Sequence, residues 1–365
     1  MATDFGGAIY NESHGGSVNR SDFCGNLPTH IHGRYSDGGA NSFADTCLGT
    51  ECASIQGVIQ VPSAVATIAQ AITCAVDGDV IEVGPGFYSE AIDFQGKRIT
   101  IEATHGPTAT YLDGSGLSGT SLVTFRSGES SESILRGFTL FGSAAGTVDG
   151  DTNQFVGGAI YVYGASPTIE ECIIAHNSSG IGGGGYLRYS EATIRNCLIR
   201  GNSAVNGGGL AIVDSDTVLQ DVEFIGNEAT NFGGGLGVGM TGQAPGNVLL
   251  DGCVMRWNSA GASGGGIAVS LQQSQFGVIL METTVCSNES NSIHGEWFDQ
   301  GGNTVCGCMA DITGDGAVDG ADLAQLLGGW GPNDDPVESL GDFDGDGLIN
   351  GADLAQLLGM WGNCQ

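Results

Sequence analysis

The sequence predicts an all-β solenoid whose coils stack their strands in parallel, followed by a small α-helical module. Three observations carry this prediction: a repeat with a period of about 25 residues between 155 and 290, a high glycine content, and a segment near the C-terminus that occurs twice. The 365 residues include 65 glycines, roughly two and a half times ordinary usage. Helix interiors do not tolerate so much glycine, whereas repeated tight turns use it.

The repeat has a glycine pair near its start and an asparagine at its end. Counting back eight, five and three residues from each asparagine gives three columns of mostly apolar residues, and a fourth column follows each glycine pair. Short strands with inward apolar positions, joined by such turns, describe a solenoid. We expect the asparagines to form a ladder in which each amide bonds the coil above or below. They are Asn177, Asn202, Asn227, Asn258 and Asn288, and the columns begin with Val162, Ile169, Cys172 and Ile174.

The stretch before residue 155 fits the same scheme more loosely. Val65–Ala75 predicts a short capping helix, and Asp77–Tyr88 predicts the first coil. Leu135, Phe138 and Leu140 continue the apolar columns.

Two pieces of the repeat, Gly-Gly-Ala-Ile at 157–160 and Phe-Ile-Gly-Asn at 224–227, resemble the repeat of polymorphic outer-membrane proteins. The coil pattern over most of 55–305 resembles the right-handed parallel β-helix of pectate-lyase-like proteins. That resemblance implies a right-handed β-helix and, as the alternative function, a polysaccharide lyase or glycoside hydrolase acting on acidic polysaccharide. A fold alone does not establish an activity, and a polygalacturonase-like set of acidic motifs is absent. We therefore name no catalytic residue and leave open whether the protein is an enzyme.

Residues 1–54 match the end of this solenoid. Ile-His32-Gly follows Cys24 as Ile-His294-Gly follows Cys286, with the same spacing of eight residues from Cys to His. We expect 1–54 to be the C-terminal tail of an upstream β-helix, 55–305 a complete β-helix, and 306–365 the calcium module. The repeated Ile-His-Gly is interpreted as a structural edge motif.

The segment Asp311–Asp322 returns 31 residues later as Asp342–Asp353, and each copy runs into the same Leu-Ala-Gln-Leu-Leu-Gly helix and then a Trp. Oxygen side chains at positions 1, 3, 5, 9 and 12, with Gly at position 6, match the EF-hand calcium loop, in which position 7 offers its carbonyl. Two bound Ca²⁺ ions are therefore expected. The ligands would be Asp311, Thr313, Asp315, Ala317, Asp319 and Asp322 in the first loop, and Asp342, Asp344, Asp346, Leu348, Asn350 and Asp353 in the second.

This doublet resembles a type I dockerin, and most closely the dockerin-like C-termini of planctomycete surface proteins, which share the Asp-Gly-Ala-Asp-Leu run, a Trp-Gly and a terminal Cys. The resemblance covers about 306–365 and implies a cohesin-like or cell-surface anchoring partner. Thr313 replaces the usual Asp or Asn at position 3, so we expect the first site to be weaker. No Lys or Arg follows Arg256, whereas the dockerins of cellulosomes carry basic residues after their helices.

The eleven cysteines divide into two groups. Cys172, Cys197 and Cys253 fall in a core column and are expected to be a ladder of buried thiols rather than disulfides. The others are disulfide candidates, suggested by the duplication and by the flanks of the calcium doublet. The expected pairs are Cys24 with Cys47, Cys286 with Cys306, Cys308 with Cys364, and Cys52 with Cys74.

Composition limits the setting and the partners. The formal net charge of −31, with 10 Lys and Arg against 41 Asp and Glu, disfavours nucleic acid and anionic membranes. No apolar run is long enough to span a bilayer. Calcium loops and cysteines favour an extracellular or cell-surface location. The first ten residues do not form a signal peptide, so we expect that signal upstream of this chain.

One outward patch is a candidate glycan contact. In the 25-residue register Tyr161 stacks on Tyr186, and Tyr163 lies beside Arg188. Exposed aromatic rings beside Arg can grip sugars, while a plain stacking ladder is the simpler interpretation. Inter-coil ion pairing is expected between the Glu170–Glu171 coil and the following one, which carries Arg188, Arg195 and Arg200. The sequence thus predicts a structural or adhesive β-helix protein with a calcium-binding docking or anchoring module.

Overall fold

The computed structural model of the chain describes residues 57–144, 146–150, 153–239, 246–270, 277–305, 310–313, 317–332, 341–343 and 348–363, and the backbone of four strands before them. Of these four, β1 (Ile9–Val18) pairs in parallel with β3 (Ile31–Asp37), and β2 (Asp22–Cys24) pairs in parallel with β4 (Ser42–Ala44). Stacked coils would give such pairs. The division of the chain at residues 54 and 305 remains a prediction.

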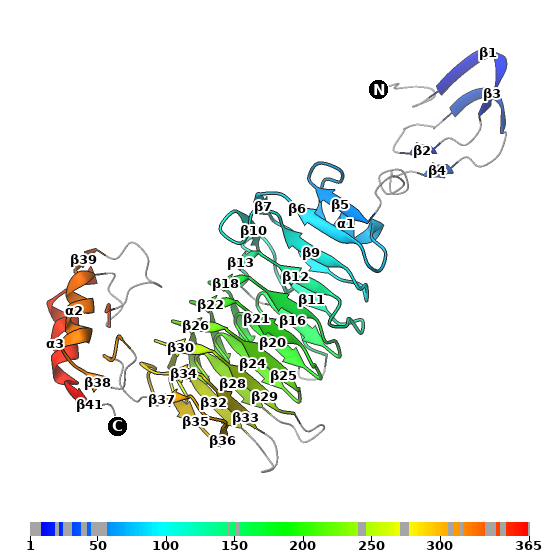
Figure 1. The fold of residues 1–365 in the computed structure, drawn as a ribbon. Coiled ribbons are helices and arrows are strands. Elements are labelled where there is room, and N and C mark those ends of the chain that lie inside the picture. The colour runs from blue at the N-terminus through cyan, green and yellow to red at the C-terminus, as the bar shows by residue number, and fades with distance from the viewer. Residues whose placement is uncertain are drawn as a thin grey trace.

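Residues 57–305 form a parallel β-helix, and its coils follow one another along a single axis (Figure 1). Two long sheets form two of its sides. The ten-stranded sheet contains β5 (Val58–Val61), β6 (Val80–Val83), β9 (Thr100–Ala103), β12 (Ile134–Arg136), β17 (Thr168–Glu170), β21 (Thr193–Arg195), β25 (Thr217–Gln220), β29 (Val248–Asp251), β33 (Val278–Met281) and β36 (Trp297–Asp299). The nine-stranded sheet contains β7 (Gly86–Tyr88), β10 (Thr110–Asp113), β13 (Thr139–Phe141), β18 (Ile173–Ala175), β22 (Leu198–Arg200), β26 (Glu223–Ile225), β30 (Val254–Arg256), β34 (Thr284–Val285) and β37 (Thr304–Val305).

Two further sheets complete the coils, and they meet at the glycine pairs. The eight-stranded sheet contains β8 (Ile92–Asp93), β11 (Val123–Phe125), β16 (Ile160–Tyr163), β20 (Gly185–Arg188), β24 (Leu210–Val213), β28 (Leu236–Gly239), β32 (Ile267–Ser270) and β35 (Ile293–His294). The six-stranded sheet contains β14 (Thr147–Val148), β15 (Phe155–Val156), β19 (Ser178–Ile181), β23 (Ser203–Asn206), β27 (Glu228–Phe232) and β31 (Ser259–Ala260). All these pairings are parallel except β14 with β15.

The predicted apolar columns are confirmed as the core. Ile169 pairs with Ile194, Ile174 with Ile199, and Val162 with Leu187. These side chains are fully or almost fully buried in one continuous cluster that runs the length of the β-helix. A period of about 25 residues therefore places equivalent side chains directly above one another, so each coil buries its neighbour.

The asparagine ladder is also confirmed. The side-chain oxygen of Asn227 accepts from the backbone N–H of Asn202 at 3.1 Å and from its amide nitrogen at 3.0 Å. The amide nitrogen of Asn227 donates to the carbonyl of Ile199 at 2.8 Å and to the side-chain oxygen of Asn258 at 2.9 Å. Each buried asparagine thus satisfies backbone groups of the turn that would otherwise be unpaired.

The glycine pairs form the corner between the six-stranded and eight-stranded sheets, where coils approach closely. A Cβ atom on Gly208 would lie 2.3 Å from the carbonyl oxygen of Glu228 and 2.5 Å from that of Gly234. Only glycine fits this contact. Gly207, just before it, has φ of +65°, which glycine adopts without strain.

The capping helix expected at Val65–Ala75 is α1 (Ile68–Cys74). Thr67 accepts from the N–H of Gln70 at its start. At its end Lys97 donates to the carbonyls of Ile72 and Ala75, at 2.5 and 2.8 Å. The only lysine of the chain therefore satisfies the last carbonyls of the cap.

The C-terminal module contains α2 (Gly320–Gly328) and α3 (Gly351–Gly359). Two short antiparallel pairs join its halves: β38 (Ala317–Val318) with β41 (Gly362–Asn363), and β40 (Leu348–Ile349) with β39 (Gly331–Pro332). Each strand that precedes one helix thus pairs with the segment that follows the other helix. Among the described residues, none of the helices α1, α2 and α3 is long and apolar enough to cross a membrane.

The three core cysteines are free and buried, as predicted. The backbone N–H of Cys172 donates to the sulfur of Cys197 at 3.4 Å. Burial raises the pKa of Cys197 well above its ordinary value and that of Cys253 to about 12. Cys74 and Cys286 are disulfide-bonded. Their expected partners, Cys52 and Cys306, lie outside the described residues, as do Cys47, Cys308 and Cys364, so the pairings remain predictions.

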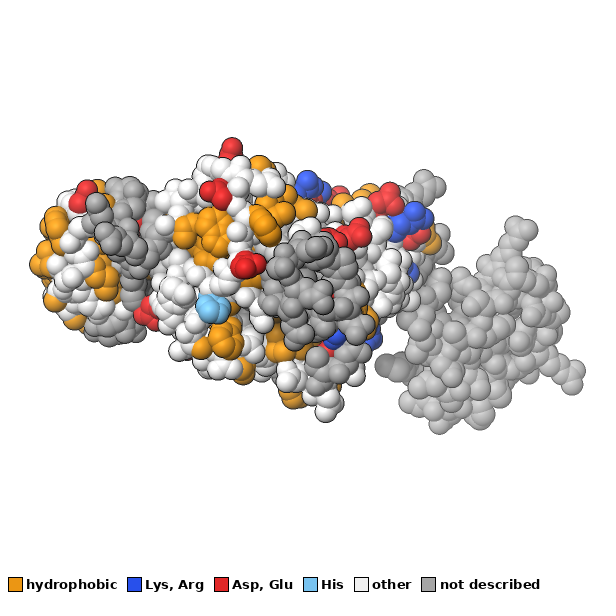
Figure 2. Space-filling model, turned by 90° about the horizontal axis from the view of Figure 1, so that it is seen from below, with side chains coloured by type: hydrophobic (Ala, Val, Ile, Leu, Met, Phe, Trp, Pro, Cys, Tyr) orange, Lys and Arg blue, Asp and Glu red, His pale blue; other side chains and the backbone are white. Residues whose placement is uncertain are grey.

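Charged side chains form an inter-coil ladder on the ten-stranded sheet. Glu170 lies between Arg136 and Arg195, whose Nε atoms donate to its two carboxylate oxygens at 2.5 Å. The ion pairing expected between these coils is confirmed for Glu170 and Arg195. On the face shown in Figure 2, the basic side chains of the described residues gather toward the N-terminal half of the β-helix.

Candidate binding groove

A groove runs along the corner between the eight-stranded and six-stranded sheets, and over its C-terminal coils it opens into a cavity of about 510 Å³. This volume lies within the range of about 300–1,000 Å³ that is typical of ligand sites. Because successive coils supply equivalent positions, the groove is described below by its floor and its walls.

The floor is one column of outward-facing residues on the eight-stranded sheet. Tyr161 pairs with Tyr186, Tyr186 with Ala211, and Ala211 with Gly237. The column continues through Ala268 to His294. Two large rings therefore fill the N-terminal part of the groove, and the three small residues that follow leave the space of the cavity.

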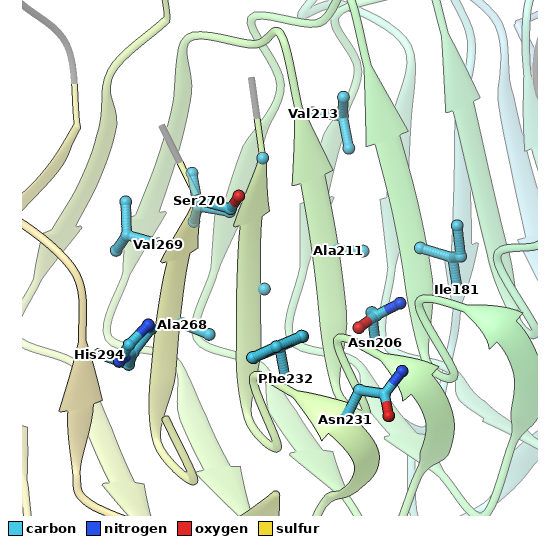
Figure 3. A pocket seen from close by; sticks show the side chains of 13 residues that line it. Ile181, Asn206, Ala211, Val213, Asn231, Phe232, Ala268, Val269, Ser270 and His294 are labelled. Atoms are coloured by element: carbon cyan, nitrogen blue, oxygen red, sulfur yellow. The ribbon is translucent and has the colours of Figure 1, made fainter. Parts of the chain in front are cut away.

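The wall belongs to the six-stranded sheet, where Ile181, Asn206 and Phe232 occupy successive register positions. Figure 3 shows Asn206, Phe232 and Asn231 on this side and Ala268, Ser270 and His294 on the other. The rings of Phe232 and His294 lie with their centroids 6.4 Å apart and their planes inclined by 27°. Phe232 is 45% exposed, so an apolar ring is available at the rim.

The tyrosine patch predicted from the sequence lies at the closed end of this groove, and its predicted exposure is wrong. The register is as expected, and the rings of Tyr161 and Tyr186 stack with centroids 6.2 Å apart. Yet Tyr161 is 6% and Tyr186 2% exposed, because Val156 and Ile181 of the six-stranded sheet pack over them. The repeat period alone placed these rings on the surface. The six-stranded sheet covers this face of the eight-stranded sheet and buries them.

Arg188 is buried in the same region rather than presented to solvent. Its Nη1 lies 3.6 Å from a carboxylate oxygen of Asp149, and its Nε lies 3.9 Å from one of Asp214. The Tyr161 hydroxyl donates to Asp149 at 3.4 Å. Burial, together with Asp149, raises the pKa of Tyr161 to about 12. Tyr163 is half-buried, with its ring against Tyr189. These residues brace the closed end of the groove.

The residues of the open groove were not identified from the sequence, although a signal was present. The outward position that carries Tyr161 and Tyr186 in two coils carries Ala211, Gly237 and Ala268 in the next three. The change from large to small side chains at this one register position marks the cavity. His294, interpreted as part of an edge motif, does lie on β35, the C-terminal edge strand of its sheet, and it also lines the groove.

The two predicted calcium loops show similar internal hydrogen bonds. The buried carboxylate of Asp322 accepts from the N–H groups of Thr313 and Asp319, both at 2.8 Å. The buried carboxylate of Asp353 accepts from Phe343 at 2.7 Å and from Asn350 at 2.8 Å. The carboxylate at position 12 is therefore held by the backbone at positions 3 and 9 in the first loop. In the second loop it is held by the backbone at positions 2 and 9.

This arrangement fits an oxygen-preferring cation, because the described ligand candidates offer carboxylate, hydroxyl, amide and carbonyl oxygens. Within the described residues no three His, Cys, Asp or Glu side chains gather to hold a metal ion. Asp315, Asp344 and Asp346, which supply positions 3 and 5, lie outside them. Calcium binding remains a prediction.

The comparisons with known proteins agree with the coil geometry. Residues 136–295 match the family described as the right-handed β-helix region. This part of the chain is a right-handed β-helix. No curated protein matches the chain.

Three solved structures are similar to part of this chain, and all are pectin methylesterases. One was crystallised with a hexasaccharide; it is 12% identical, with 67% of this chain and 81% of that chain covered and a TM-score of 0.34. The enzyme from Aspergillus niger is 12% identical, with 72% and 94% covered and a TM-score of 0.32. The enzyme from carrot is 15% identical, with 69% and 86% covered and a TM-score of 0.32. At these TM-scores the likeness says nothing about a shared site.

Proposed function

We propose that this is an extracellular or surface-displayed β-helix protein of structural or adhesive type, which binds a polysaccharide chain in its groove. The observation that carries the proposal is the change in side-chain size along the groove floor, from Tyr186 to Ala211, Gly237 and Ala268. An elongated cavity with an aromatic ring and amide side chains along one wall suits a chain of sugars, because apolar sugar faces pack on rings and hydroxyls bond to amides.

Binding is favoured over the alternative of polysaccharide cleavage. A glycoside hydrolase needs two carboxyl groups at a set separation, and a lyase needs carboxylates that hold calcium beside a base. The described residues that line the cavity include no Asp, Glu, Lys or Arg. The described lining of the groove therefore offers contacts to a glycan but not the groups that these two reactions need.

The C-terminal module is proposed to be a dockerin-like docking or anchoring module that binds two Ca²⁺ ions, with the ligands named above. Its exposed apolar side chains support a docking role. Leu327 and Trp330 are each 49% exposed, and their counterparts 31 residues on, Leu358 and Trp361, are 51% and 49% exposed. Such patches commonly mark interaction sites. The disulfide-bonded Cys74 and Cys286 support an extracellular setting.

A groove-filling variant tests the polysaccharide proposal. Ala211→Tyr continues the Tyr161–Tyr186 column, so the coil should accept the ring while the cavity loses its space. Binding to a panel of immobilised polysaccharides should fall by about tenfold or more, equivalent to about 1.4 kcal/mol. Val218→Tyr, which adds the same ring on the exposed side of β25, should leave binding unchanged. Equal binding by parent and Ala211→Tyr would contradict the proposal.

A further inference from the structure

The charge of the groove identifies the class of glycan, and this inference rests on the proposed polysaccharide binding. The polar groups that line the cavity are the amides of Asn206 and Asn231, the hydroxyl of Ser270 and the imidazole of His294. No described lining residue is a lysine or arginine. We infer that the groove binds an uncharged glycan chain and discriminates against chains of uronic acids, although many proteins of this shape act on acidic polysaccharide.

The basic side chains of the described residues are committed elsewhere. Lys97 caps α1, and Arg256 donates to carbonyls of the C-terminal module. Four others pair with carboxylates on the surface or along the coil ladder, Arg188 pairs in the buried cluster, and Arg200 also has partners. The four are Arg98, Arg126, Arg136 and Arg195. No basic side chain of the described residues is therefore left to bind the carboxylates of an acidic chain.

The negative charge around the groove also disfavours an acidic glycan. The whole chain carries a formal charge of −31, and at the closed end of the groove one arginine, Arg188, faces two aspartates, Asp149 and Asp214. A polymer with one carboxylate per sugar would bring like charges together, which opposes association.

The groove instead offers what an uncharged sugar can use. The half-exposed ring of Phe232 faces the cavity beside Asn206 and Asn231 (Figure 3). A ring contacts the C–H face of a pyranose, and amide groups both donate to and accept from hydroxyls. These contacts are short-ranged and do not depend on salt, unlike the attraction of an anionic chain to basic residues.

A matched pair of probes isolates charge from shape: fully methyl-esterified oligogalacturonides and the same oligomers after de-esterification. Hexamers of β-1,4-linked glucose, mannose and xylose extend the uncharged set. Calorimetry is run on the full chain in EDTA, which keeps calcium from bridging carboxylates. At least one uncharged hexamer should bind about tenfold or more tightly than the de-esterified one, with little change between 0.1 and 0.5 M NaCl, as expected for uncharged partners.

Charge-matched variants sharpen the test. Ser270→Lys places a cation at the rim of the groove and should raise affinity for the de-esterified hexamer. Val218→Lys adds the same charge on β25, away from the groove, and should not. Tighter binding of the de-esterified hexamer by the parent protein, sensitive to Ala211→Tyr, would overturn the inference while leaving the groove as the binding site. No binding of any probe would overturn the proposed function and the inference with it.

Discussion

Arg256, the last Lys or Arg in the sequence, joins the β-helix to the C-terminal module through Ile312. Its Nη1 donates to the Ile312 carbonyl at 3.1 Å, and its Nη2 donates to the Thr313 carbonyl at 3.4 Å. Trp257, next along the chain, packs against the module's core, and the Ser287 hydroxyl donates to the Asp311 carbonyl at 2.5 Å. The β-helix thus holds the beginning of the first predicted calcium loop, at positions 1 to 3.

Arg256→Met should loosen the module without unfolding the β-helix. Hydrogen bonds to a charged group contribute about 1.5–3 kcal/mol, so amide exchange in α2 of the full chain should accelerate by about tenfold or more. Arg98→Met is the control, since Arg98 forms exposed ion pairs with Asp77 and Glu132 at the other end of the molecule. Unchanged exchange in α2 would show that the Arg256 contacts do not hold the module.

Asn227→Ala should be strongly destabilising, because it breaks the ladder in its middle. The change leaves the buried N–H of Asn202 and carbonyl of Ile199 without their partner, at about 1–3 kcal/mol for each unsatisfied group. Urea unfolding of the β-helix measures the loss. Gln220→Ala removes an exposed amide from the same coil and should change the free energy of unfolding by less than about 0.5 kcal/mol.

Glu170 predicts an acid-sensitive contribution to stability. Burial opposes its ionisation, but the hydrogen bonds from Arg136 and Arg195 outweigh burial and lower its pKa below the ordinary 4.5. A group whose pKa is lowered on folding stabilises the protein above its unfolded pKa, and that stability is lost as pH falls through the folded value.

The parent should therefore exceed Glu170→Gln by about 1.5–3 kcal/mol in free energy of unfolding at pH 7. The difference should shrink as pH falls below about 4.5. Urea unfolding at a series of pH values measures it. Glu132→Gln, at an exposed position, serves as the control with a small difference throughout. A Glu170→Gln difference that grew toward acid pH would contradict the sign of the shift.

The sequence was most informative where one periodicity controlled both backbone and packing. The 25-residue spacing placed Ile169, Ile174 and Val162 in their registers, because a parallel coil repeats its inward positions without drift. It also placed Tyr161 beside Tyr186. It did not reveal that these two rings are buried. Their burial depends on side chains of the six-stranded sheet that pack over them, and the spacing within one column carries no information about contacts with another column.

The module shows the same limit. The doublet predicted α2 and α3, and it placed Asp322 and Asp353 at position 12 of the two loops, where each lies in the first turn of its helix. Trp330 and Trp361, which follow the two helices, are each 49% exposed. The core is instead completed from outside by Trp257, a residue of the β-helix. A repeat reports what its copies share, and Trp257 lies outside both copies.

Calcium should fold the module and bind its two loops unequally. Each loop gathers acidic side chains, and residues 306–365 contain no Lys or Arg to offset them. The small core that includes Leu326 and Leu357 is too limited to fold readily without further support, so binding should be coupled to folding. Isolated 306–365 should be largely unfolded in chelator and become helical with two Ca²⁺ ions. Circular dichroism and calorimetric titration measure both quantities.

In the full chain the two loops can be separated by a matched pair of variants, Asp311→Ala and Asp342→Ala, each at position 1. Each should remove one of two calcium ions, and the site left in Asp311→Ala should be the tighter. The reason is that position 3 is Asp344 in the second loop and the uncharged Thr313 in the first, and calcium affinity rises with ligand charge. Full helicity of 306–365 in excess chelator, or no calcium uptake at millimolar concentration, would rule out calcium-coupled folding. The tighter site surviving in Asp342→Ala would show instead that the contacts of Arg256 and Ser287 with the first loop outweigh the missing carboxylate.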